Sequence, residues 1–212
     1  MKTLPVLVVV AALSVACTAP MSPADPASSR HSSQPAPSGS SLPAGTSTAP
    51  IPAPGTCHMG SENGNPLPDQ HCTPGALNPD VNQGNIGSTI CKSGWTSTVR
   101  PPVSVTNRIK KQIDTAYGLP TDTVGELDHD VSLELGGAPN DARNFWVEPG
   151  PIPNPKDRVE NQFNAAVCSG LITLTVAQTA IAHDWVTAVT DAGLVVSGSK
   201  VCLKTNPSRC VR

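Results

Sequence analysis

The sequence predicts one α+β domain over residues 57–212. Three segments carry apolar side chains at helical spacing, which favours three amphipathic helices. Apolar residues alternate along residues 125–135, and a second short apolar run follows a pair of glycines, which indicates a β-hairpin. Six of the seven cysteines also lie in this part of the chain. We therefore expect disulfide bonds to staple the domain.

Residues 1–16 have the pattern of a signal peptide. Lys2 supplies a positive charge, and residues 4–15 form an apolar run that is shorter than the roughly 20 residues of a membrane span. The small residues before Cys17 resemble the lipobox of bacterial lipoproteins, in which this cysteine is lipidated. Ser14 is a weaker choice than the Leu usually found there, so ordinary secretion stays open. The predicted location is the outer face of the cell membrane, or the exterior if Cys17 carries no lipid.

The stretch after the signal peptide is predicted to be a lipidated cysteine and a disordered tether, over residues 17–56. Residues 18–56 consist largely of Pro, Ser, Ala, Thr and Gly and include no aromatic side chain. Such a composition buries too little apolar surface to offset the entropy lost on ordering. The tether would hold the domain away from the membrane, which it touches only through the lipid.

Assigning Cys17 to lipid leaves six cysteines, which are Cys57, Cys72, Cys91, Cys168, Cys202 and Cys210. An even number of cysteines in an oxidising compartment predicts three disulfides. The favoured pairs are Cys57–Cys72, Cys202–Cys210 and Cys91–Cys168, with Cys72–Cys91 as the competitor. The neighbouring His58 and His71 could instead complete a zinc site with Cys57 and Cys72, but the oxidising compartment favours a disulfide.

Local signals set the ends of the three predicted helices. The first covers residues 106–117. The second follows Asn154, a good N-cap, and runs to about Cys168. The third covers residues 174–190, and His183 lies off its apolar stripe, so we expect it at the surface. The predicted buried residues are Ile109, Ile113, Ala116 and Tyr117; Val159, Phe163, Ala166 and Val167; and Ala177, Ile181, Trp185 and Ala188.

The predicted hairpin begins with a strand over residues 125–135. His129 shares the alternation of the apolar residues and is expected to point to the same side. Gly136 and Gly137 end the strand, and residues 144–147 return. The apolar residues that define the alternation are Leu127, Val131, Leu133 and Leu135.

The hairpin residues carry a family resemblance. The run Glu126–His129, the glycine pair Gly136–Gly137 and the return run Arg143–Trp146 resemble HNH endonucleases, and more narrowly a bacterial group of small exported HNH-like proteins. The resemblance covers roughly residues 72–190, including Lys156–Asn161 in the second helix. It implies a ββα-metal core, in which a hairpin and a helix form the site, with further helices around it.

The resemblance implies a nuclease that hydrolyses phosphodiester bonds with Mg²⁺ or Mn²⁺, with Zn²⁺ as the alternative. His129 would be the general base, because a histidine near neutral pKa can accept a proton from water. Asp128 would be a hard oxygen ligand for the metal. Asn144 would hold the His129 ring through its side-chain carbonyl.

The third metal-site position departs from the family pattern. That position is usually a His or Asn on the helix, and no histidine occurs between His129 and His183. Asn161 falls opposite the apolar stripe and is expected to face solvent, whereas Lys156 lies at the stripe's edge. The candidates for the third ligand are Glu160 and Asn154, ranked equally, followed by Asp157.

The charge balance argues against tight DNA binding. Residues 92–170 contain eight basic and ten acidic side chains, whereas nucleases that hold a duplex tightly present a basic face. We expect weak, non-specific nucleic-acid binding, aided by Arg100, Arg108, Lys110 and Lys111, and no oligomer is indicated. The alternative hypothesis is a catalytically silent envelope lipoprotein that binds a partner or a carbohydrate with the same scaffold.

The lipobox pattern makes a testable prediction. Cys17→Ser should release the protein from membranes or block its maturation, because the acylated side chain is lost. Fractionation of cells that express the parent or the variant measures this. If the variant partitions with membranes as the parent does, the lipoprotein hypothesis is wrong.

Overall fold

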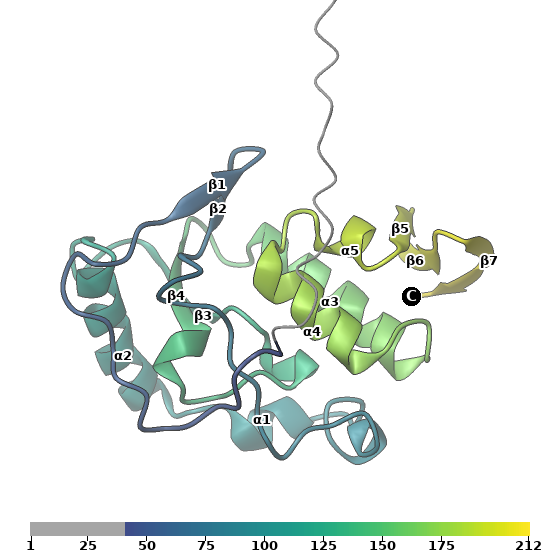
Figure 1. Ribbon diagram of the computed structural model, residues 1–212, viewed down its shortest axis with the longest axis horizontal. Helices are drawn as coiled ribbons and strands as arrows, with labels where there is room; N and C mark the ends of the chain where they lie inside the picture. Colours follow the sequence, from purple (N-terminus) through teal and green to yellow (C-terminus); the bar gives the residue numbers. More distant parts are fainter. Residues whose placement is uncertain (1–40) are drawn as a thin grey trace, which may run out of the picture. The chain divides into compact units, whose positions relative to one another are not determined.

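The structure, a computed structural model, describes residues 41–212 and is a mixed α+β fold (Figure 1). The predicted signal peptide, Cys17 and residues 18–40 of the predicted tether lie outside the described residues. In the described part, no helix has the length and apolar character needed to cross a membrane. The helices are α1 (Trp95–Val99), α2 (Val103–Ala116), α3 (Pro155–Cys168), α4 (Leu174–His183) and α5 (Ala188–Asp191). The strands are β1 (Gly60–Glu62), β2 (Asn65–Leu67), β3 (Gly125–His129), β4 (Phe145–Pro149), β5 (Leu194–Ser197), β6 (Lys200–Leu203) and β7 (Asn206–Val211).

The antiparallel hairpin of β3 and β4 lies between two groups of helices (Figure 1). On one side α2 packs across both strands, and Ile113, Phe145 and Val147 form a buried apolar cluster there. On the other side lie α3 and α4, which form a second apolar cluster around Phe163 and Ile181. The hairpin thus separates two small cores.

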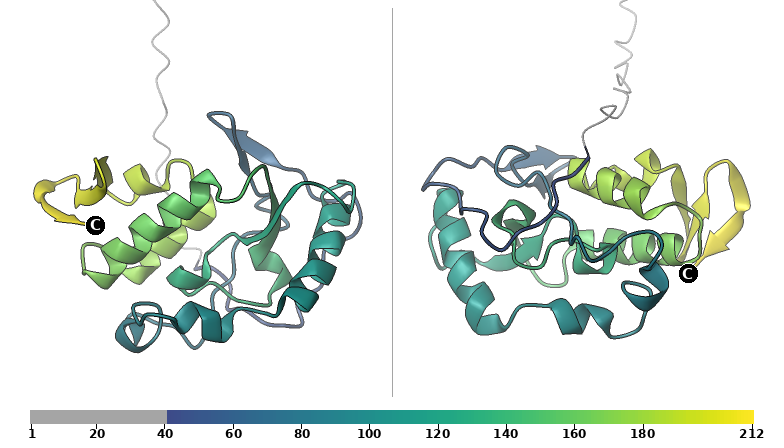
Figure 2. Two further views of the ribbon diagram at one scale, coloured as in Figure 1. Left: turned by 180° about the vertical axis from the view of Figure 1, so that it is seen from behind. Right: turned by 60° about the horizontal axis from the view of Figure 1, so that its bottom comes forward.

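The C-terminal strands β5, β6 and β7 form a three-stranded antiparallel sheet. Figure 2 shows this sheet beside α3 and α4, far from α2. The sheet contacts α5 and α3, and Leu194 and Val201 bury their side chains in the cluster with those helices. The C-terminal segment therefore extends the core beyond the disulfide loop that the sequence predicts.

Local capping signals placed α3 correctly. The Asn154 side chain accepts hydrogen bonds from the backbone N–H groups of Lys156 and Asp157, and the Asp157 side chain accepts one from the Asn154 backbone N–H. This capping box fixes the first turn. Phe163, Ala166 and Val167 are buried as predicted, and the helix ends at Cys168.

Two predicted elements are shorter than expected because tertiary contacts intervene. The strand predicted to reach Leu135 ends at His129, and Leu133–Leu135 form a 3₁₀ turn in which Ser132 accepts hydrogen bonds from later backbone N–H groups. The helix predicted over residues 174–190 breaks after His183. The Asp184 side chain accepts from the next backbone N–H groups, and the Trp185 indole donates to the Pro66 carbonyl. His183 is exposed and Trp185 is buried, as predicted.

The predicted boundary between tether and domain at residue 56 is wrong, because residues 41–56 lie against the domain. The Gly45 N–H donates to the Leu77 carbonyl at 2.6 Å, and the Thr46 N–H donates to Asp141 at 2.7 Å. A Cβ atom on Gly45 would come within 2.3 Å of Ala138 Cβ, so this approach requires glycine. Composition alone did not show it, since backbone groups make these hydrogen bonds and only isolated apolar side chains, Leu42 and Ile51, pack against the clusters.

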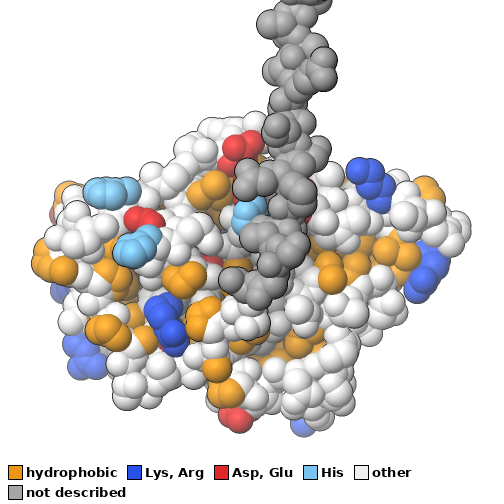
Figure 3. Space-filling view, viewed as in Figure 1, with side chains coloured by type: hydrophobic (Ala, Val, Ile, Leu, Met, Phe, Trp, Pro, Cys, Tyr) orange, Lys and Arg blue, Asp and Glu red, His pale blue; other side chains and the backbone are white. Residues whose placement is uncertain are grey.

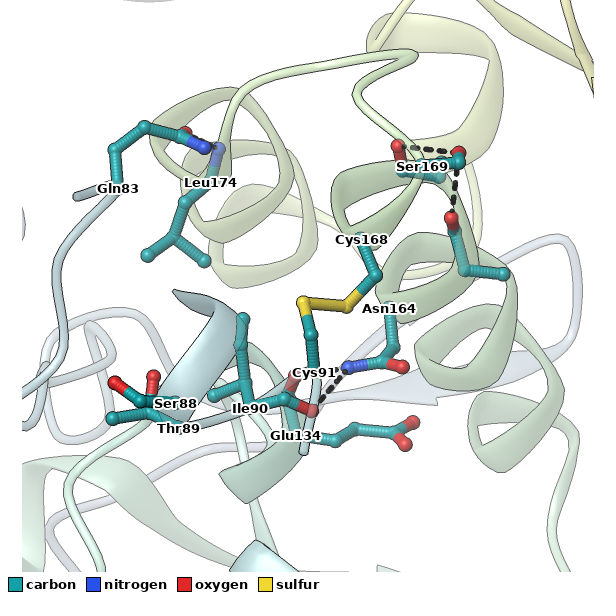
Figure 4. Close-up of a disulfide and its surroundings, with 12 residues drawn as sticks. Gln83, Ser88, Thr89, Ile90, Cys91, Glu134, Asn164, Cys168, Ser169 and Leu174 are labelled. Atoms are coloured by element: carbon teal, nitrogen blue, oxygen red, sulfur yellow. Dashed lines mark hydrogen bonds between the residues drawn. A yellow bond between two sulfur atoms is a disulfide. The ribbon is translucent and has the colours of Figure 1, made fainter. Parts of the chain in front are cut away.

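The three favoured disulfides are confirmed. Cys57–Cys72, Cys91–Cys168 and Cys202–Cys210 are within bonding distance, so the competing Cys72–Cys91 pair does not form. Cys91–Cys168 joins the segment before α1 to the end of α3 (Figure 4). Beside it, the Asn164 carboxamide donates to the carbonyls of Ile90 and Glu134. These contacts fix α3 against the turn that carries Glu134.

We expect a disulfide that closes a longer loop to contribute more to the free energy of unfolding. Loss of Cys91–Cys168, with a sequence separation of 77, should cost about 4.5 kcal/mol, because its removal frees the largest loop in the unfolded chain. Loss of Cys202–Cys210, with a separation of 8, should cost about 2.5 kcal/mol. Urea denaturation of the two paired Cys→Ser variants measures both values. Equal losses would contradict this ranking.

Candidate functional site

A polar cavity of about 240 Å³ lies where the end of β3 meets α3. Asp128 and His129 line it from β3, and Glu160 lines it from the second turn of α3. The structure therefore brings together the two hairpin residues and one of the two helix residues that the sequence ranked first. The other lining residues are Thr96, Arg100, Glu126, Leu127, Ser132, Leu133, Glu134, Asp157 and Asn161.

His129 is buried at the hairpin end of this cavity, with 6% of its surface exposed. Its Nε2 atom lies 3.3 Å from the Pro139 carbonyl oxygen, and its ring packs against Phe145. A carbonyl only accepts, so Nε2 carries the proton and Nδ1 is left as a hydrogen-bond acceptor. Burial lowers the pKa of His129 to about 4, although the nearby Asp128 carboxylate opposes this shift. The ring is therefore a neutral base at physiological pH.

Lys156 holds the two predicted metal-site carboxylates together. Its Nζ atom donates to Asp128 Oδ2 and to the His129 carbonyl, both at 2.8 Å, and also to Glu160 Oε1. The lysine is 1% exposed. Burial lowers the pKa of its ammonium group, but Asp128 and Glu160 outweigh that effect and raise it. A permanent positive charge thus joins β3 to α3.

Carboxyl groups outnumber cations around this ammonium. Burial, and then the charge of Asp157, raises the pKa of Glu134 to about 7. Burial and then Asp128 raise the pKa of Glu126, whose side chain accepts from the Asn154 carboxamide. Such shifts show that ionising these groups costs free energy where they lie. The cavity is therefore an acidic site that would gain from a further cation.

The predicted contact between Asn144 and the His129 ring is not found. Asn144 Oδ1 accepts from the backbone N–H groups of Val131 and Ala76, and Nδ2 donates to the carbonyls of Val131 and Ala138. The carboxamide is fully used by the loop that follows β3. Asn144 acts on His129 indirectly, by fixing the turn that carries the Pro139 carbonyl.

The glycine pair after β3 is part of the same turn. A Cβ atom on Gly137 would lie 1.7 Å from the Val131 carbonyl oxygen and 2.9 Å from Asn144 Nδ2. Only glycine allows the two segments to approach so closely. The motif residues Gly137 and Asn144 therefore fix the conformation of the loop and do not line the cavity.

Comparisons of the chain with protein families, with curated proteins and with solved structures found no match.

The structure separates the candidates for the third metal-site position. Glu160 lines the cavity, and so does Asp157. Asn154 does not, and both lone pairs of its Oδ1 atom are used by the helix N-cap. The predicted ligand role of Asn154 is therefore not supported. Asn161 is exposed, as expected, at the cavity's rim.

The donor set suits one kind of metal ion. Within residues 41–212, no three His, Cys, Asp or Glu side chains are grouped as ligands, whereas zinc sites usually have three or four. Mg²⁺ requires less, because it binds through one or two carboxylates, retained waters and substrate phosphates. Asp128 and Glu160 each give one oxygen to Lys156, and in the described part of the chain the second oxygen has no hydrogen-bond donor. These two residues fit Mg²⁺ or Mn²⁺.

Two buried acids close to the charges of the cavity were not predicted from the sequence. Asp130 is fully buried, and within the described residues neither of its carboxyl oxygens has a hydrogen-bond partner. Glu148 is 2% exposed, and its Oε2 also lacks a partner there. Glu148 lies opposite Glu126 in the hairpin register, so pairing the two predicted strands could have placed it. Burial raises the pKa of both acids, and the positive charge of Lys156 lowers it by less.

The residues of the predicted basic cluster have different surroundings. Arg100 lines the cavity, whereas Lys110 on α2 donates to Asp114 of the same helix and to the Thr123 carbonyl beyond it. On the face viewed in Figure 3, Lys and Arg side chains are scattered singly. Weak, non-specific nucleic-acid binding stays a prediction.

Glu148 should make stability depend on pH. Burial, and then the Asp128 charge, raises the pKa of Glu148 to about 8. The protonated carboxyl therefore adds to the free energy of unfolding at low pH, and this contribution is lost as pH rises through that value. Glu148→Gln mimics the protonated form. Relative to the parent, the variant should gain about 1–4 kcal/mol between pH 5 and pH 9, since one pKa unit corresponds to about 1.4 kcal/mol. Urea denaturation at both pH values tests this, and an equal difference at both would refute it.

Proposed function

We propose that this protein is an exported, metal-dependent nuclease that hydrolyses phosphodiester bonds with little sequence specificity. The observation that carries the proposal is the neutral imidazole of His129, fixed by the Pro139 carbonyl and facing a carboxylate-lined cavity. A base held in one tautomer next to oxygen ligands suits the activation of a water molecule. The resemblance of residues 126–146 to HNH endonucleases supports the same chemistry and a ββα-metal core.

His129 supplies the base in this proposal. Its Nδ1 atom takes a proton from the attacking water while the water oxygen bonds to phosphorus, and the ring becomes an imidazolium. The bond from phosphorus to the leaving oxygen breaks, and that oxygen takes its proton from solvent water. The Asp128 carboxylate stabilises the imidazolium charge, as its effect on the His129 pKa indicates. The Pro139 carbonyl keeps the ring oriented throughout, because its hydrogen bond to Nε2 does not depend on the state of Nδ1.

Asp128 and Glu160 would hold Mg²⁺ or Mn²⁺ through the oxygens that Lys156 leaves free. When bound, the cation supplies charge neutralisation for the phosphate and its leaving oxygen. Lys156 fixes the two carboxylates at the cavity wall, and all three of its N–H groups already have acceptors. It therefore acts as a positioning residue and does not bind phosphate.

Lys156 also supports a second candidate function. Its ammonium already satisfies one oxygen of both carboxylates, as a bound metal would. A chain that had lost its metal would need such a substitute to keep the charges buried. The second candidate is therefore a catalytically silent, lipid-anchored module that binds a partner or a carbohydrate on the same scaffold.

His129→Ala should lower the rate of cleavage about 10²–10⁴-fold, which is the usual contribution of a general base. The measurement is hydrolysis of bis(4-nitrophenyl) phosphate and of an oligonucleotide in Mg²⁺ or Mn²⁺, with EDTA as the metal-free arm. Because the pKa of His129 is about 4, the base itself should stay unprotonated down to roughly pH 5. His183→Ala, an exposed histidine on α4, is the matched control and should behave as the parent does.

Calorimetry separates the two candidate functions. Mn²⁺ binding to the parent, weakened in Asp128→Ala and retained in His129→Ala, supports the nuclease. If the folded parent neither binds metal nor cleaves the substrates, the nuclease proposal is wrong and the silent module takes its place. Equal cleavage by parent and His129→Ala would show that the activity comes from elsewhere.

A further inference from the structure

A second cavity, of about 720 Å³, lies next to the first along α3. Arg158, Asn161 and Gln162 line it from the helix, and Ser199 and Arg212 line it from the C-terminal sheet and the residue that follows. Asp157 and Asn161 line both cavities, so the two meet on the exposed side of α3. We refer to the two neighbouring cavities together as the groove, with one end at His129 and the other at the C-terminal sheet.

The two ends of this groove differ in charge. The His129 end carries five carboxyl side chains and Arg100, whereas the distal end carries Arg158 and Arg212 with Asp157. Among residues 41–212, Arg158 forms no salt bridge, so its guanidinium is available to a ligand. Asn161 gives one N–H to the Asp157 carbonyl and keeps its side-chain oxygen free, and Gln162 adds a second amide. The distal end thus offers guanidinium and amide groups, which bind phosphates and the polar edges of bases.

We infer that the distal cavity binds the part of an unpaired nucleic-acid strand that flanks the scissile phosphate, with Arg158 on a neighbouring phosphate. This inference rests on the proposed nuclease function and names its substrate class, single-stranded DNA or RNA. The covalent staple Cys202–Cys210 and the packing of β6 on α3 fix the far wall of the cavity.

The shape of the groove favours a single strand over a duplex. Proteins read duplexes with a protruding helix, strand or arm that enters a groove of the nucleic acid. Here the site is concave, and 720 Å³ lies within the range of small-ligand pockets. A flexible strand can bend into such a hollow and expose its base edges, which a stacked duplex does not do.

The test compares a polymer with a small substrate that does not reach the distal cavity. Arg158→Glu should lower kcat/KM for a single-stranded 12-mer about 10- to 100-fold more than for bis(4-nitrophenyl) phosphate, the loss expected for one charge-assisted bond. Arg209→Glu is the matched control, because Arg209 is exposed on β7 and lines neither cavity. DNA and RNA 12-mers form separate arms, each compared with the duplex of the same sequence.

Binding in EDTA keeps the inference testable without catalysis. Fluorescence anisotropy should show that the parent and Arg209→Glu bind the single strand more tightly than the duplex, and that Arg158→Glu loses this binding. If the parent cleaves both substrates and Arg158→Glu affects them equally, the distal site is wrong and the nuclease stands. If the parent cleaves neither substrate but binds the 12-mer through Arg158, the nuclease is wrong and the strand-binding groove stands. A parent that prefers the duplex, or binds neither, overturns the inference.

Discussion

The buried ammonium of Lys156 is the contact on which the site depends. It ties the end of β3 to the first turns of α3 by donating to Asp128, Glu160 and the His129 carbonyl. Removing such a partner from a buried charge cluster typically costs about 3–5 kcal/mol, because the remaining charges stay uncompensated. The same three bonds set the distance between the base and the carboxylates. One side chain therefore contributes both to the stability and to the geometry of the site.

A second constraint holds the imidazole itself. Asn144 saturates its carboxamide on backbone groups around Val131 and Ala138, and the glycine at 137 allows those segments to touch. The turn that results presents the Pro139 carbonyl to His129. The motif residues thus divide into two kinds. His129 and Asp128 line the cavity, whereas Gly137 and Asn144 shape the loop that orients them.

Local signals predicted α2, α3, α4 and the β3–β4 hairpin, whereas α1 and the C-terminal sheet were not predicted. The Asn154 cap and the apolar stripe located α3 within the sequence itself. Cysteine parity predicted three disulfides, and the favoured pairs are the ones that form. The strand after His129 was overextended because a 3₁₀ turn buries Leu133 and Leu135 with the same alternation. The helix over 174–190 was broken by Trp185, whose indole bonds a carbonyl more than a hundred residues away. In the same way, Asp128, His129 and Glu160 could be named as candidates, but their joint partner Lys156 could not.

Helix α3 connects these observations, because it forms a wall of both cavities. Its first turn is fixed by the Asn154 capping box, its second by Lys156 and Glu160, and its end by Cys91–Cys168. Phe163, Ala166 and Val167 pack the buried face of this helix into the larger apolar cluster. The disulfide at its end and the buried polar bonds of Lys156 add further constraints on its position. Since Asp157 and Asn161 belong to both cavities, any shift of α3 would alter both cavities together. The proposed cleavage and the proposed strand binding are therefore expected to change together when this helix is perturbed.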